Sequence, residues 1–171
     1  MEFKHYVGID VSKNTLDVVV IRNANDTPNH IQISNDNNGF KQLTMWFKKL
    51  EKFNFSTALF CMEHTGIYNN PVLHFLSKRS CTIWVENAIH IQKSIGLQRG
   101  KNDKVDAHRI AVYAVKNKEE LNEYKPRRES IEQLKVLSSL RDQLVAMKKE
   151  IATRINEYQK LALRTSNHQT I

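Results

Sequence analysis

The first third of the chain contains three short apolar runs separated by residues that favour turns. The runs are His5 to Val11, Leu16 to Arg22 and the alternating run His30 to Ser34. The segments between them, 12–14 and 23–29, are rich in Asn, Ser and Asp. Short runs joined by such turns are typical of antiparallel strands. We therefore predict a three-stranded meander at the start of the fold.

Helix and strand patterns alternate after this meander. A helix is predicted beyond 35–38, with an apolar face that comprises Phe40, Leu43, Phe47 and Leu50. The later predicted elements are a buried strand over Thr57 to Met62, a helix after Pro71, and a strand over Thr82 to Val85. No strand pattern is present from Ala88 onward. This order predicts an α/β fold with a mixed sheet and helices on its faces.

Acidic residues lie at positions that usually hold apolar side chains. Asp10 interrupts the first apolar run, and Glu63 directly follows a later one. A carboxylate in a buried strand is costly unless it is paired, hydrogen-bonded or bound to a cation. Asp103 and Asp106 are three residues apart at the start of a helical pattern, so they share one face near an N-terminus that favours negative charge. The four acids are our candidate catalytic and metal-binding residues.

Carboxylate oxygens are the ligands that Mg²⁺ and Mn²⁺ prefer, and a cation lets neighbouring acids all stay ionised. We expect Mg²⁺ (or Mn²⁺) as cofactor, in two ions about 3.5–4 Å apart. His64 and His108 are near these acids in the sequence and are either ligands, phosphate contacts or structural residues. Asp17, on the second predicted strand, is interpreted as an exposed or turn-bonded carboxylate rather than a ligand.

The excess of positive charge is concentrated in the middle of the chain. The net charge is +8, and residues 87–128 carry 10 Lys and Arg against 5 Asp and Glu. Cations beside an acidic metal site suit a phosphodiester partner. The candidate nucleic-acid contacts are Lys13, Lys93, Arg99, Lys101, Lys104 and Arg109. A solvated basic face is the alternative interpretation.

A long helix is predicted after the break at 125–128. One heptad frame places these residues at its a and d positions: Leu137, Leu140, Leu144, Met147, Ile151, Tyr158 and Leu161. Arg154 is the exception at a d position. A helix of about 35 residues spans roughly 50 Å, which favours a coiled coil that makes homo-oligomers. The alternative is an amphipathic helix that docks on its own domain or on a further domain.

The predicted organisation is a catalytic domain over 1–124, a coiled-coil helix over 129–163 and a polar tail over 164–171. The two cysteines, Cys61 and Cys81, lack metal-type spacing. The sequence shows neither a signal-like segment nor a long apolar span, so we expect a cytoplasmic protein with reduced thiols and no membrane contact.

Three stretches of the chain carry a family resemblance. They are Gly8-Ile9-Asp10-Val11-Ser12-Lys13 with Leu16-Asp17-Val18, Met62-Glu63-His64-Thr65-Gly66-Ile67-Tyr68, and Lys101-Asn102-Asp103-Lys104-Val105-Asp106-Ala107. In order and spacing they resemble the N-terminal DEDD domain of the insertion-sequence transposases that include the Piv-type DNA invertases and the bridge-RNA-guided recombinases. The resemblance covers about residues 5 to 115.

This resemblance implies an RNase H-like, RuvC-like fold, Mg²⁺ as cofactor, and DNA with a structured guide RNA as partners. It carries the four acidic roles onto Asp10, Glu63, Asp103 and Asp106. Asn102 departs from the family, which often has Thr or Ser there. Family members also continue into a domain with a serine proposed to attack DNA, and the sequence ends at Ile171 without it. We therefore expect this chain alone to be an incomplete recombinase.

The sequence is compatible with three functions. The leading hypothesis is the metal-dependent catalytic half of a DNA transposase or site-specific recombinase, RNA-guided in its full-length form. A complete RuvC-like junction endonuclease is the second, and a non-catalytic module that binds nucleic acid and dimerises is the third. An actin-like sugar-kinase fold is excluded because it needs Gly-rich phosphate loops, and the chain has only 5 Gly.

Overall fold

The structure is a computed structural model that describes residues 2–95, 103–126 and 129–166. Within these ranges the description leaves out the side chains at 95, 103, 104, 129, 132 and 162–166. The chain divides into two compact units, Met1–Lys125 and Pro126–Ile171.

The first unit is built on one five-stranded sheet with the order β3-β2-β1-β4-β5. Its strands are β1 (His5–Val11), β2 (Thr15–Ile21), β3 (Asn29–Ser34), β4 (Ala58–Glu63) and β5 (Thr82–Glu86). The first three pair antiparallel, whereas β4 and β5 run parallel to β1. The predicted meander and the mixed sheet are thus confirmed. Outside these strands, the described residues add one isolated bridge between Trp84 and Glu123.

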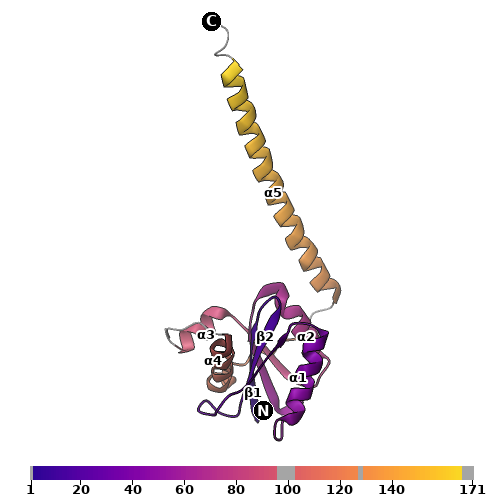
Figure 1. The fold of residues 1–171 in the computed structure, drawn as a ribbon, viewed down its shortest axis with the longest axis vertical. Coiled ribbons are helices and arrows are strands. Elements are labelled where there is room, and N and C mark those ends of the chain that lie inside the picture. The colour runs from indigo at the N-terminus through magenta and orange to yellow at the C-terminus, as the bar shows by residue number, and fades with distance from the viewer. Residues whose placement is uncertain (1, 96–102, 127–128, 167–171) are drawn as a thin grey trace. The chain divides into compact units, whose positions relative to one another are not determined.

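Helices cover both faces of this sheet (Figure 1). The helices α1 (Asn37–Lys49) and α2 (Asn70–Ser77) lie on one face, and α3 (Ala88–Ile95) and α4 (Asp103–Lys116) on the other. Short 3₁₀ turns occur at η1 (Phe55–Thr57), η2 (Gly66–Asn69) and η3 (Lys118–Glu120). The helix α3 was not predicted from the sequence.

The start of α1 follows directly from the local sequence. The Asp36 carboxylate caps the helix, because its Oδ1 accepts hydrogen bonds from the backbone N–H groups of Asn38 and Gly39, each at 2.9 Å. The predicted apolar face then enters the core through Phe40, Leu43 and Phe47, all buried. Leu50 forms the C-cap of the helix.

Strand alternation assigns β1 residues to the two faces of the sheet. Val7 and Ile9 belong to the apolar cluster beneath α1 and α2, whereas Tyr6 belongs to the cluster beneath α4. Gly8 therefore faces α4. A Cβ at Gly8 would lie 2.1 Å from the Ala107 carbonyl oxygen, so only glycine permits this close approach of helix and strand. The same face carries Asp10, two residues further on.

The second unit contains α5 (Glu129–Ser166), a single helix of 38 residues. The apolar side chains of the predicted heptad frame are exposed along it, among them Leu144, Met147 and Ile151. None of the helices within the described ranges combines the length and the apolar character that crossing a bilayer requires.

Candidate metal centre

Four acidic residues form a row across four neighbouring strands, on the sheet face that α4 covers. Asp10 on β1 is the antiparallel partner of Asp17 on β2, and Glu63 on β4 is the parallel partner of Glu86 on β5. The two pairs are neighbours in the sheet. Ile9 of β1 pairs with Met62 of β4, and Asp10 and Glu63 are the next residues on these two strands. Paired residues share a face. The four carboxylates thus leave the sheet on the same side.

The carboxylate at one end of the row, Asp17, is fully engaged by the edge strand β3. Its Oδ1 lies 2.7 Å from His30 Nε2, and its Oδ2 accepts a hydrogen bond from Gln32 Nε2 at 2.9 Å. Asp17 is only 4% exposed. The expectation of an exposed or turn-bonded carboxylate was wrong, because the partners come from β3 rather than from a turn. Both oxygens are used for structure, which supports a non-ligand role.

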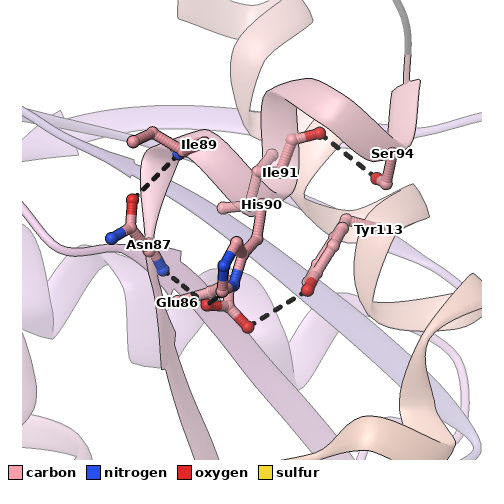
Figure 2. A network of polar contacts seen from close by, with 7 residues as sticks. All are labelled: Glu86, Asn87, Ile89, His90, Ile91, Ser94 and Tyr113. Atoms are coloured by element: carbon pink, nitrogen blue, oxygen red, sulfur yellow. Dashed lines mark hydrogen bonds and ion pairs between the residues drawn. The ribbon is translucent and has the colours of Figure 1, made fainter.

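Glu86, at the other end of the row, is held in a polar network that the sequence reading missed (Figure 2). Its Oε1 accepts from the Asn87 backbone N–H at 2.7 Å and lies 3.0 Å from His90 Nδ1. Its Oε2 accepts from the Tyr113 hydroxyl at 3.1 Å. Burial and this hydrogen bond raise the pKa of Tyr113, so the hydroxyl keeps its proton. The network ties β5 and α3 to α4.

The two central acids of the row are Asp10 and Glu63, and the charge of Asp106 on α4 acts on Glu63. Both strand residues are partly buried. Burial raises the pKa of Glu63, and the negative charge of Asp106 raises it further. The charge of Asp106 thus reaches Glu63 across 43 positions of sequence, because α4 packs on the face of the sheet from which Glu63 points. Like charges held together in this way are stabilised by a cation.

Arg109 already provides one positive charge at this place. Its guanidinium Nη1 donates to Asp106 Oδ1 at 2.8 Å, one helical turn away on α4. The Arg109 Nε atom is buried and has no hydrogen-bond partner among the described residues. Arg109 was predicted as a nucleic-acid contact, and here it holds the carboxylate of Asp106. Asp103 begins α4, but its side chain is outside the description.

A buried asparagine shapes the backbone immediately after Glu63. Asn69, only 1% exposed, donates from Nδ2 to the Glu63 carbonyl oxygen at 2.9 Å. Its Oδ1 accepts from the backbone N–H and the hydroxyl of Thr65, at 2.6 and 2.9 Å. One side chain therefore closes the loop between β4 and η2. The sequence analysis missed Asn69; its place two residues before Pro71 was the available signal of a helix start, although its side chain bonds to the loop rather than to the helix.

A second asparagine joins the segments that follow the two strand acids. Asn35 Nδ2 donates to the carbonyl oxygen of Ser12 at 3.1 Å and to that of Tyr68 at 3.0 Å. Ser12 is two residues beyond Asp10, and Tyr68 is five beyond Glu63. The loops at this edge of the sheet are thereby fastened to each other. The sequence reading treated Asn35 only as part of a helix start.

The two candidate histidines have structural contacts or lie in a buried position. His64 is exposed, and its Nδ1 accepts a 3.4 Å hydrogen bond from the Gly66 N–H. His108 on α4 has a buried Nε2 with no partner among the described residues, and burial lowers its pKa. Neither observation assigns a ligand role to these residues.

The structure describes only some of the basic residues that were predicted to contact nucleic acid. Lys13 is exposed in the turn between β1 and β2, and Lys93 is exposed on α3. Arg99 and Lys101 lie outside the described residues, and of Lys104 only the helical backbone is described. Lys13 thus lies three residues beyond Asp10, at the edge of the sheet that carries the candidate centre.

The residue types at the candidate centre, though not their spacing among the described side chains, suit a hard divalent cation. Asp10, Glu63 and Asp106 offer carboxylate oxygens, which Mg²⁺ and Mn²⁺ prefer. Within the described side chains, a set that excludes Asp103, no three His, Cys, Asp or Glu residues are grouped closely enough to hold a metal ion. Cys61 and Cys81 are free thiols, and burial raises the pKa of Cys81 to about 11. A soft thiolate site is therefore not suggested.

The sheet order and the flanking helices define a RuvC-like fold. Two structures of Thermus thermophilus RuvC, one in complex with a Holliday junction substrate, align with TM-scores of 0.53 and 0.50. Each alignment covers 70% of this chain and 99% of the RuvC chain, at 9% and 10% identity. At such identity the likeness concerns the fold alone.

The family follows from the sequence comparison. A family model of DEDD transposases of the IS110 type, described as "Transposase", matches residues 7–162. The chain belongs to this DEDD transposase family. It is also 34% identical over 116 residues to the pilin gene-inverting proteins of Moraxella bovis and Moraxella lacunata. Those matches cover 66% of this chain and only 35% of each relative, so the chain spans about a third of their length.

Proposed function

We propose that this chain is the metal-dependent catalytic half of a DNA transposase or site-specific recombinase. The observation that carries the proposal is that Asp10 and Glu63, at the ends of two adjacent parallel strands, face α4, where the charge of Asp106 acts on Glu63. Membership of the DEDD transposase family supports it. The names of the pilin gene-inverting relatives support DNA rearrangement as the reaction class.

In this proposal Asp10, Glu63, Asp103 and Asp106 hold two Mg²⁺ or Mn²⁺ ions. Held there, such ions would supply charge neutralisation for the phosphodiester and activation of the attacking oxygen. The chain's own residues prepare the place for this chemistry. Arg109 orients the Asp106 carboxylate through its 2.8 Å contact. Asn69 fixes the backbone that carries Glu63. Asp17 and Glu86 use their carboxylate oxygens in hydrogen bonds within the domain, so they do not compete with the central acids for the ions.

DNA is the proposed partner, and Lys13 and Lys93 are proposed phosphate contacts together with Arg99, Lys101 and Lys104. A structured guide RNA and homo-oligomerisation through a coiled coil of α5 belong to the same proposal for the full-length protein. The binding of nucleic acid should weaken with salt, since Lys and Arg displace counterions. Lys13→Ala should lower the slope of log Kd against log salt by about 1. Lys41→Ala, at an exposed position of α1, is the control.

The decisive test is a metal titration in the absence of nucleic acid. Mn²⁺ at about 100 times its Kd should stabilise the wild type by about 2.7 kcal/mol, seen as a higher melting temperature. Asp10→Asn and Glu63→Gln should each reduce this response, whereas the exposed-site controls Asp142→Asn and Glu51→Gln should not. Identical responses in the wild type and in the Asp10→Asn/Glu63→Gln double variant would refute the shared site.

The reaction products distinguish the three candidate functions. Strand transfer that requires Asp10 supports a transposase, while hydrolysis of a four-way junction without transfer supports a RuvC-like endonuclease. Binding of DNA without any metal-dependent change in the strands supports a non-catalytic module. The assay should include a longer version of the protein that extends to the length of the inverting relatives, because this chain spans about a third of them.

A further inference from the structure

Two large apolar side chains are exposed in the loop that follows Glu63. Ile67 is 62% exposed and Tyr68 is 40% exposed. Both belong to η2, the short 3₁₀ turn that begins three residues after Glu63. Exposed apolar residues scattered singly need no explanation, but here an aliphatic and an aromatic residue are adjacent at a functional edge.

Hydrogen bonds fix the position of this pair relative to the strand acids. The Asn35 Nδ2 group joins the Tyr68 carbonyl oxygen to the Ser12 carbonyl oxygen, at 3.0 and 3.1 Å. Tyr68 is thereby held next to the turn that follows Asp10. Asn69, the next residue, is bound to the Glu63 carbonyl oxygen. The η2 turn is therefore bonded to the end of β4 and, through Asn35, to the turn that follows β1.

The turn presents Ile67 and Tyr68 outward for a local reason. Gly66, which precedes them, has a φ of +68°, a conformation that favours glycine. Asn69, which follows them, is 1% exposed and points inward. The pair therefore lies between a left-handed glycine and a buried amide, so its exposure results from a defined backbone path.

We propose that Tyr68 and Ile67 form a stacking platform for one unpaired nucleobase adjacent to the phosphodiester at the carboxylate centre. This proposal rests on the proposed function, because it takes DNA as the substrate. Aromatic side chains beside a cationic residue are the usual platform for unstacked bases, and Lys13 lies in the same turn as Ser12. The aromatic ring offers a π-face that accepts any of the four bases.

The platform has a consequence for the preferred substrate. Taking a base out of a duplex costs a few kcal/mol, and the cost is smallest for a mismatched or already single-stranded base. The chain should therefore prefer branched, bulged or single-stranded DNA over an intact duplex of the same sequence. The preference should depend on Tyr68, since this residue replaces the lost stacking.

A fluorescence titration tests the platform directly. The probe is a four-way DNA junction with 2-aminopurine in the unpaired step at its crossover, in Ca²⁺ so that the strands stay intact. Tyr68→Ala should weaken binding by roughly 5- to 150-fold and abolish the quenching of 2-aminopurine by the wild type. Tyr68→Phe should keep both. Met45→Ala, at an apolar site on α1 that is 57% exposed against 40% for Tyr68, should bind as the wild type does.

Each outcome has one interpretation. An unchanged affinity and unchanged quenching in Tyr68→Ala overturn the platform and leave the metal centre untouched, and they favour cover by a further segment of protein. If the wild type binds no junction, both the platform and DNA as the substrate are refuted. The metal centre is tested independently, by the metal titration without DNA. Equal melting temperatures of wild type and Tyr68→Ala exclude unfolding as the cause of weaker binding.

Discussion

The Ala107 carbonyl oxygen of α4 lies where a side chain on Gly8 of β1 would begin, 2.1 Å from the position of a Cβ. The Ala111 backbone nitrogen is nearly as close to that position, at 2.4 Å. Helix and central strand therefore pack backbone to backbone. This contact sets the height of α4 above the sheet, and with it the place of Asp106 above the strand acids.

Gly8→Ala should lower the free energy of unfolding by about 1–3 kcal/mol, because the added methyl group forces α4 away from β1. The comparison is Gly66→Asn, which keeps a left-handed residue at a position with nothing within 4 Å. That variant should remain close to the wild type. Urea unfolding curves measure both, and a Gly8→Ala variant as stable as Gly66→Asn would contradict the packing described.

Asp17→Asn should destabilise the fold without removing metal binding. The substitution places an amide donor against the donors of His30 and Gln32, at an expected cost of about 1–3 kcal/mol. Urea unfolding and a Mn²⁺ titration measure the two properties separately. A lost Mn²⁺ response in a folded Asp17→Asn protein would instead make Asp17 a ligand, and Asp10→Asn provides the comparison.

The stability of the domain should fall as pH drops below 6.5, in part through His5. Burial, with the positive charges of Arg22 and Lys4, lowers the pKa of His5 below its ordinary value of 6.5. The unfolded chain then binds more protons than the folded one between the two pKa values, so the stabilisation is complete above pH 6.5 and is lost as pH falls through the folded pKa. The same direction holds for His108.

His5→Gln should therefore flatten part of this pH dependence between pH 7.5 and 5. The exposed His74 on α2 provides the control, since His74→Gln should leave the profile unchanged. Unfolding free energies at half-unit pH intervals make the measurement. A His5→Gln profile parallel to the wild type would show that His5 does not titrate in this range.

Self-association through α5 should depend on the face that carries the heptad frame. Leu144→Gln and Ile151→Gln should lower the mass in solution by removing apolar contacts between helices. Val145→Gln is a matched control, because Val145 is 53% exposed against 56% for both Leu144 and Ile151 but lies outside the a and d positions. Analytical ultracentrifugation distinguishes them. An equal loss of mass in all three variants would mean that the heptad frame does not define the interface.

Local patterns were enough to predict the strands and the positions of the central acids. The meander, the helix with Phe40 and Leu43, and the strand that ends at Glu63 all follow from nearest-neighbour periodicity. Glu86 follows its apolar run in the same way as Glu63, so the sequence signal was present for both. Their different surroundings were not predictable, because the partner of Glu86, Tyr113, lies 27 positions away.

The asparagine side chains that join the loops could not be predicted, for the same physical reason. Asn35 connects carbonyl groups that are 23 and 33 positions away, and no local pattern encodes such a bond. The burial of Asp17 depends likewise on pairing with β3. Sequence reasoning thus located the acids but could not tell which carboxylates the fold had already satisfied.

The placement of β1 at the centre of the sheet determines when the acids first meet during synthesis. The antiparallel partner of β1 is complete at Ile21, while its parallel partner begins only at Ala58. Contacts close in sequence form fast, and distant ones must first overcome the entropy of a long loop. The hairpin of β1 and β2 can therefore form on the ribosome before β4 and α4 have emerged. Repulsion between Glu63 and Asp106 can arise only after α4 has been synthesised, whereas the β1–β2 hairpin does not depend on either residue.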